Sequence, residues 1–141
     1  MPEIIRIGPL ELHFLRSKEE TGGSLDMFEM ICPPEGQMPA AHYHRDWEET
    51  AYGLEGTITF TVDGKPVEIG PSDHLFIPRG IVHGFDNRSG ARARCLSILT
   101  PGVLGPGYFR ALAALVAAGP PNPAALRGLM LRHGLVPVDN E

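Results

Sequence analysis

The chain has few cysteines and no concentration of basic residues. Its two cysteines, Cys32 and Cys95, are far apart and do not form a CxxC or another zinc-type spacing. We therefore expect buried free thiols rather than metal ligands. No Lys/Arg run is present, and 17 acidic residues outnumber 12 basic ones. A nucleic-acid partner is therefore not expected.

Long hydrophobic runs are also missing. No run reaches the roughly 20 apolar residues that a membrane-spanning helix needs. The opening MPEIIRIG lacks the basic and apolar regions of a signal peptide. We therefore expect a cytoplasmic protein with no membrane partner. Hydrophobic residues still make up 43% of the 141 residues, which suits one folded domain with a real core.

Short β-type segments fill the first two thirds of the chain. Thr57 to Val62 alternates hydroxyl and apolar side chains, as in a strand buried on one face. Asp63-Gly64 then predicts a tight hairpin turn. Many short strands separated by turns predict a sandwich or barrel. We expect strands at residues 3–7, 10–16, 25–31, 49–54, 57–62, 66–69, 74–77, 82–85 and 91–99.

The last third of the sequence changes to an Ala- and Leu-rich composition. Residues 105–119 and 121–134 predict two helices. Asn122 suits an N-cap, and Gly134 suits a helix end. We expect residues 1–104 to form the barrel. Residues 105–141 are expected to pack on it, within the same domain, as a helical tail that flanks the barrel or lies over its mouth.

The stretch AHYHRDWEET, residues 41–50, combines imidazole and carboxylate groups. His42 and His44 are two residues apart, so on a strand they point to the same face. Glu48 or Glu49 follows, and His83 stands downstream. Three neutral imidazoles and one carboxylate suit a divalent transition metal. An octahedral ion would keep two positions open for water, substrate or dioxygen.

The spacing of these residues forms two ordered sets. The first set contains two glycines, two histidines and a glutamate: Gly36, His42, His44, Glu49 and Gly56. The second set contains Pro78, Gly80, His83 and Asn87. Together they resemble the two motifs of the cupin superfamily, over roughly Ser24 to Leu99. The chain is most similar to small single-domain bacterial cupins of the quercetinase-like, cupin 2 type. Ser72 stands where the second motif usually opens with glycine, and this departure affects no ligand.

The resemblance implies an all-β fold, a double-stranded β-helix or jelly-roll barrel, followed here by the short C-terminal helical hairpin. It also implies that His42, His44, Glu49 and His83 hold one divalent transition metal ion, which could be Fe, Mn, Ni, Cu or Zn. Ligands alone do not identify the metal. Cupins usually form dimers, so we expect a homodimer in which an uncovered N-terminal strand extends the partner's sheet.

The two glutamates are not equivalent in this reading. Strand alternation from the histidines favours Glu48, but residues 45–47 resemble a turn, and a turn resets the alternation. The spacing of the first motif selects Glu49 instead. Ala51 and Gly53 would then share its face, and their small size would leave room for a ligand. Glu48 is expected at the rim or behind the ligands.

Other candidate residues receive structural interpretations. His13, His74 and His133 are expected to have structural roles, the last at a helix end where a partly positive imidazole suits the helix dipole. Trp47 is expected at the rim of the site or in a subunit contact. Met27, Met30 and Met38 could line the cavity as flexible apolar side chains, and core packing is equally expected for Met27 and Met30.

The resemblance and the ligand set favour a metal-dependent enzyme. We expect an oxygenase that acts on a small aromatic or oxygenated organic substrate chelated to the metal, with Glu49 doubling as a catalytic base. One alternative is a non-oxidative isomerase, lyase or decarboxylase that uses the metal as a Lewis acid. Another is a non-catalytic module that binds a small molecule or a sugar. The apolar strands predict a hydrophobic cavity, which favours an aromatic or apolar ligand over a free sugar.

Overall fold

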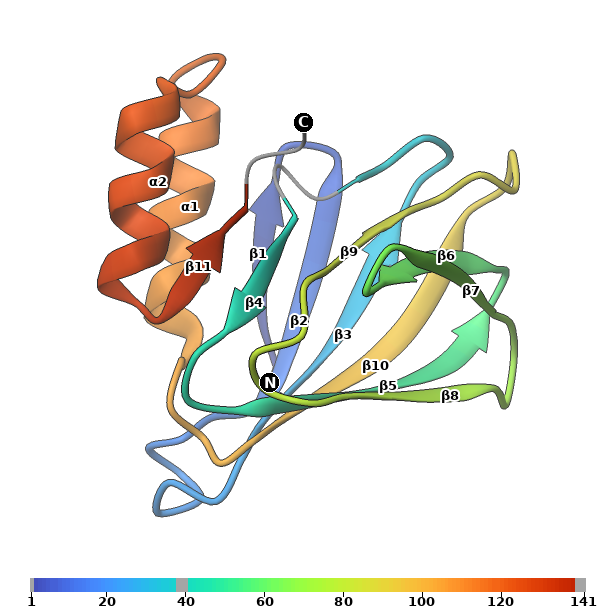
Figure 1. Ribbon diagram of the computed structural model, residues 1–141, viewed down its shortest axis with the longest axis horizontal. Coiled ribbons are helices and arrows are strands. Elements are labelled where there is room, and N and C mark those ends of the chain that lie inside the picture. The colour runs from blue at the N-terminus through green and yellow to red at the C-terminus, as the bar shows by residue number, and fades with distance from the viewer. Residues whose placement is uncertain (1, 38–40, 139–141) are drawn as a thin grey trace.

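Two antiparallel sheets face each other in the computed structural model, which describes residues 2–37 and 41–138 (Figure 1). The six-stranded sheet runs in the order β1 (Glu3–Ile7), β2 (Leu10–Arg16), β3 (Asp26–Cys32), β10 (Ala93–Thr100), β5 (Glu48–Glu55) and β8 (His74–Ile77). The five-stranded sheet runs β11 (Leu135–Pro137), β4 (His42–His44), β9 (His83–Asp86), β6 (Ile58–Val62) and β7 (Lys65–Ile69). The predicted all-β jelly-roll barrel is confirmed.

The core lies between the two sheets because one face of each strand is apolar. Strands β3 and β10 alternate buried and partly exposed residues along their whole length, the period of two that a sheet requires. Phe14 and Phe28 stack across β2 and β3 with ring centroids 5.3 Å apart. Cys32 and Cys95 are buried free thiols, as predicted.

The hairpin between β6 and β7 forms where the sequence predicts it. Asp63 and Gly64 have φ values of 52° and 78°. Positive φ at both central residues is the geometry of a type I′ turn, whose twist matches that of the flanking strands. Neighbouring residues Ile58 and Thr59 are both buried in this strand. The expected alternation between a solvent-exposed hydroxyl face and a buried apolar face is therefore incomplete.

Two helices follow the barrel, α1 (Pro106–Ala117) and α2 (Pro123–Arg132). Both start and stop signals of α2 are confirmed. The Asn122 side chain accepts hydrogen bonds from the backbone N–H groups of Ala124 at 2.8 Å and Ala125 at 3.2 Å. Beyond the helix, Gly134 has a φ of 86°. No described helix is long and apolar enough to cross a membrane.

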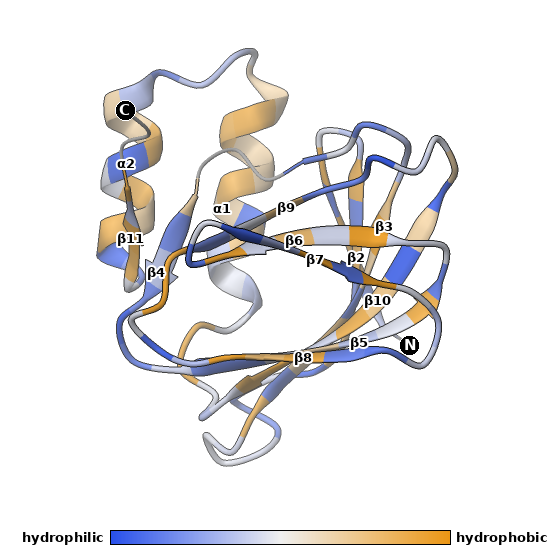
Figure 2. Cartoon of the chain, turned by 45° about the vertical axis from the view of Figure 1, so that its right-hand side comes forward, coloured by the Kyte–Doolittle hydropathy of each residue, from blue (hydrophilic) through white to orange (hydrophobic). Residues whose placement is uncertain are grey.

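The helices stand together at one end of the barrel, where α1 packs on β1 and α2 on β11 (Figure 1). Apolar residues predominate along α1 (Figure 2), and its Leu112 is buried. Arg110 donates a hydrogen bond from Nε to Glu3 at 2.6 Å, which joins α1 to β1. The short strand β11 was not predicted. It adds to the edge of β4 and ties the tail to the five-stranded sheet.

Candidate metal centre

Strand β4 and its neighbour β9 bring three histidines together. His42 and His44 are 1% and 5% exposed, whereas Tyr43 between them is turned away from the interior and is only partly buried. Strand β4 lies between β11 and β9 in the sheet, and His42 is in register with His83. The predicted common face of the HxH pair is therefore present, and a third imidazole meets it from the adjacent strand.

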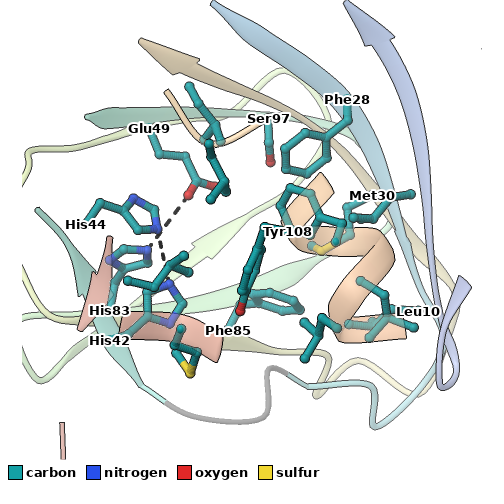
Figure 3. A pocket seen from close by; sticks show the side chains of 18 of the residues that line it. Leu10, Phe28, Met30, His42, His44, Glu49, His83, Phe85, Ser97 and Tyr108 are labelled. Carbon is teal, nitrogen blue, oxygen red and sulfur yellow. Dashed lines mark hydrogen bonds and ion pairs between the residues drawn. The ribbon is translucent and has the colours of Figure 1, made fainter. Parts of the chain in front are cut away.

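The distances among the imidazoles suit a metal ion. One ring nitrogen from each of His42, His44 and His83 lies within 4.8 Å of the others (Figure 3). The Nε2 atoms of His42 and His44 are 3.1 Å apart. Two nitrogen ligands about 2.1 Å from one ion and at right angles to each other stand about 3.0 Å apart. The pair is therefore spaced as adjacent ligands of one ion would be.

His83 is held in the form that a ligand needs. Its Nδ1 lies 3.0 Å from the backbone carbonyl oxygen of Ile81, so Nδ1 carries the proton and donates it. In the neutral ring, Nε2 is then the nitrogen with a free lone pair. That atom is buried and has no hydrogen-bond partner among the described residues. Metal-binding histidines commonly use a backbone carbonyl in this way to fix the ring and its tautomer.

Burial keeps His44 neutral. Desolvation, reinforced by His83 and His42, lowers the pKa of His44 to about 2. The ring stacks on Trp47 with centroids 4.7 Å apart and an angle of 21°. Trp47 is 0% exposed, so the predicted position at the rim or in a subunit contact is wrong. The bend between β4 and β5 lies at residues 45–47, next to His44, and the stacked indole restricts the orientation of the imidazole.

Glu49 approaches the histidines from the opposite sheet. Its Oε1 atom lies 3.8 Å from Nε2 of His83, and its side chain is 13% exposed (Figure 3). Burial raises the pKa of Glu49, while the electrostatic interaction with His83 and a hydrogen bond from Ser97 oppose this shift. Ser97 lies on the buried face of β10 and was not identified from the sequence. A hydroxyl at an inward position of an otherwise apolar strand was the available signal.

Glu48 lies outside the site. Its carboxylate accepts a hydrogen bond from Arg79, and this bond lowers the pKa of Glu48. The bend at residues 45–47 separates β4 from β5, so Glu49 points inward and Glu48 outward. The structure therefore has the orientation that was expected for the two glutamates, while ligation by Glu49 stays a prediction.

Ala51 and Gly53 follow Glu49 on β5, and their small size was expected to leave room for a ligand. The structure gives a different explanation. Ala51 is buried and Tyr52 is 40% exposed, so the predicted alternation along β5 is correct. A Cβ on Gly53 would lie 1.9 Å from the carbonyl oxygen of Gly70. Gly53 is thus required by the close approach of another backbone segment. Neither Ala51 nor Gly53 is among the described residues that line the cavity.

The imidazoles and Glu49 occupy one end of an apolar cavity of about 80 Å³. Its other wall comes from the core of the six-stranded sheet and from the two helices. Met30 lines it, as the sequence suggested, whereas Met27 is not among its described lining residues and Met38 lies outside the described residues. The helices contribute Tyr108, Phe109, Leu112, Leu126 and Met130. The tail therefore closes the mouth of the barrel, and only a few polar groups face the enclosed space.

The remaining histidines lie apart from this cluster. His13 is 2.8 Å from the carboxylate of Glu11 on the same strand. Nδ1 of His133 is 2.9 Å from the carbonyl oxygen of Leu129 at the end of α2. His74 is exposed on β8. Among the described residues, the group suited to a metal is His42, His44 and His83.

Comparison with known proteins identifies the family of the chain. The family model described as "Cupin domain" matches residues 28–99, slightly more than half of the chain. This segment contains both histidine motifs and the inward glutamate. The chain therefore belongs to the cupin family.

Two curated proteins are similar to parts of the chain. Quercetin 2,3-dioxygenase from Bacillus subtilis is 35% identical over 79 residues, which are 56% of this chain and 23% of that protein. Tetracenomycin polyketide synthase protein TcmJ from Streptomyces glaucescens is 30% identical over 66 residues, which are 47% of this chain and 44% of that protein. The chain thus spans less than half the length of each of these relatives.

Solved structures share the fold. A predicted oxalate decarboxylase from Thermotoga maritima matches with a TM-score of 0.64 and 27% identity, over 72% of this chain and 92% of that one. The polyketide cyclase RemF from Streptomyces resistomycificus matches with a TM-score of 0.58 and 28% identity, over 70% of this chain and 68% of that one. These names describe different reactions, so the reaction of this chain has to be inferred from its own site.

Proposed function

We propose that the chain is a metal-dependent oxygenase acting on a small oxygenated organic substrate. One observation carries the proposal: three buried imidazoles and a partly buried carboxylate lie together at the polar end of an apolar cavity. His42, His44, His83 and Glu49 would hold one divalent transition metal. When bound, the ion supplies Lewis acidity and, if it is redox active, the capacity to react with dioxygen.

The protein groups around the ion have distinct roles. The three neutral imidazoles fix the position at which an oxygen atom of the substrate is held. Glu49 is the one carboxylate among the described residues that line the cavity. We therefore assign it as the group that accepts a proton from the substrate, in addition to its role as a ligand. The apolar walls exclude water from the remainder of the substrate.

The size of the cavity restricts the substrate. Pockets for drug-sized ligands usually measure about 300–1,000 Å³, whereas this cavity measures about 80 Å³. A dry cavity of about 150 Å³ is known to hold benzene. A compound of a few heavy atoms therefore fits the closed form, and an aromatic substrate requires α1 and α2 to move outward.

Similarity to a dioxygenase is what favours oxygen chemistry over the alternatives. The matched segment of quercetin 2,3-dioxygenase is 35% identical. A second candidate, a non-oxidative decarboxylase, isomerase or lyase, is favoured by the similarity to the predicted oxalate decarboxylase, because this chain covers 92% of that structure. Such an enzyme would use the same four residues.

Two measurements test this proposal. The metal content of protein purified without added metal should be close to one ion per chain, and Glu49→Gln should lose metal while Glu48→Gln retains it. Loss of metal from Glu48→Gln alone would contradict the assignment. Turnover of small hydroxyketones and dicarbonyls is then compared with and without air. Oxygen uptake supports an oxygenase, equal turnover without air supports the second candidate, and full metal occupancy without turnover supports a binding module.

We also propose that the chain forms a homodimer through β1. This strand is at one edge of the six-stranded sheet, and its Ile4 is 46% exposed. An edge strand with an exposed apolar side chain favours pairing with another strand. Light scattering at micromolar concentration should give a dimer mass for the wild type and a monomer mass for Ile4→Lys. A monomeric wild type contradicts the proposal.

A further inference from the structure

Tyr108 is a buried polar residue that the proposed metal chemistry does not use. It lies in the first turn of α1, is 3% exposed, and lines the same cavity as the histidines. Figure 3 shows its ring extending into the cavity, with the hydroxyl oxygen on the side where Phe85 and the histidines lie. The tail therefore places a hydroxyl group inside the barrel, facing the end that would hold the metal.

The hydroxyl of Tyr108 is unpaired. Among the described residues it has no hydrogen-bond partner, and burial alone accounts for the raised pKa of the phenol. The group therefore stays protonated at neutral pH and can act as a donor. The hydroxyl oxygen keeps some contact with solvent, since it is not one of the fully buried atoms that lack a partner. A ligand that displaces this solvent has to offer an acceptor in its place, because a polar group buried without a partner costs free energy. A molecule bound in the cavity would supply the missing acceptor.

The position of the ring is fixed by its neighbours. It packs against the ring of Phe109 with centroids 5.3 Å apart and against His133 with the same centroid distance. The other helix residues that line the cavity are apolar, so a phenylalanine would serve equally well if packing were the only requirement. A hydroxyl at this position therefore indicates a role in recognition.

We propose that Tyr108 donates a hydrogen bond to an oxygen atom of the bound substrate and so selects small compounds with a second oxygen beside the one held by the metal. The inference rests on the proposed metal centre, because the histidines would hold the first oxygen. Hydroxyketones, hydroxamates and small hydroxy acids have this chemistry. The barrel would thus provide the reactive position, and the helical tail would recognise the substrate.

Two probes of similar size separate this role from packing. Acetohydroxamate offers two oxygen atoms, whereas ethanethiol binds a metal through sulfur and offers no oxygen acceptor. Binding of each is followed by the visible absorption of the Co(II)-loaded protein, for the wild type, Tyr108→Phe and Tyr52→Phe. Tyr52 is a matched control because it carries the same hydroxyl on the outer face of β5, where it is 40% exposed.

The expected result is selective. Tyr108→Phe should bind Co(II) as the wild type does, lose about tenfold in acetohydroxamate affinity, and bind ethanethiol within about twofold of the wild type. Tyr52→Phe should match the wild type with both probes. Equal weakening of both probes, or no change in either, overturns the role of Tyr108 and leaves the metal centre standing. A wild type that does not bind Co(II) overturns the proposed function and this inference together.

Discussion

The two ends of the cavity are built in different ways. At one end, His42 and His83 lie on neighbouring strands, and Glu49 reaches them from the facing sheet. At the other end, α1 and α2 close the barrel with apolar side chains and one hydroxyl, that of Tyr108. Backbone hydrogen bonds fix the first wall, whereas side-chain packing holds most of the second. Under the proposed function, this contrast would place the metal chemistry on the sheets and the recognition of substrate on the helices.

This division follows from what each element can provide. A metal centre requires ligand atoms placed within a few tenths of an ångström, and strands paired on both sides give that precision. A wall that admits substrate must open, and elements held by packing open at lower free energy than central strands. Four substitutions test the comparison, ordered from the largest expected effect to the smallest.

Removing a ligand from the histidine wall should have the largest effect. We expect His83→Ala to weaken Co(II) binding by more than about 100-fold, because even changes behind the ligands cost about 10–100-fold. Competition with a chromogenic chelator measures this affinity. His74→Ala is the control, since that side chain is exposed on β8. Equal loss in both variants, or none in either, contradicts the proposed centre.

Shortening one side chain of the helical wall should reduce the stability of the fold rather than metal binding. Leu112 is 5% exposed and lines the cavity, so Leu112→Ala should lower the free energy of unfolding by about 2–5 kcal/mol. Urea unfolding measures this change. Leu131 is 38% exposed, and Leu131→Ala should stay within about 0.5 kcal/mol of the wild type. The Co(II) affinity of folded Leu112→Ala should be unchanged, and a parallel loss would show that the two walls are not separate.

A smaller effect on metal affinity is expected from changing Ser97, which contacts Glu49 from β10. Ser97 donates a hydrogen bond to this carboxylate, so Ser97→Ala should weaken Co(II) binding by about tenfold through the orientation of Glu49. Ser97→Thr keeps the hydroxyl and should stay closer to the wild type. The same chelator competition measures both variants. If the two variants behave alike, the hydroxyl has no part in positioning the glutamate.

The smallest effect is expected at the start of α2. Asn122→Ala removes the side chain that accepts two backbone hydrogen bonds, so the free energy of unfolding should fall by about 1 kcal/mol. Asn122→Asp retains a capping oxygen and should remain near the wild type. Thermal unfolding of the two variants measures the difference. A change in Co(II) affinity in Asn122→Ala would count against the separation of the walls.

The arrangement of the histidines and the orientation of Glu49 were predictable because most of their signals are local. Two histidines on alternate positions and a bend before Glu49 determine which side chains share a face, and the cupin motifs bring in His83. The rest depends on contacts between distant segments. The stacking of Trp47 on His44, the orientation of Ser97 and the position of Tyr108 each require the packed barrel. The need for glycine at position 53 arises from Gly70, which a reading of β5 alone does not reveal.

The pairing of β11 with β4 has a consequence for the synthesis of the protein. Leu135 pairs with His44 and Pro137 with His42. The ribosome makes these partners late, and at about 5–20 residues per second the delay after β4 is roughly 5 to 20 s. Throughout that interval the strand of His42 and His44 has one open edge. The edge of the strand that carries two of the proposed ligands is therefore completed only after β11 has been synthesised.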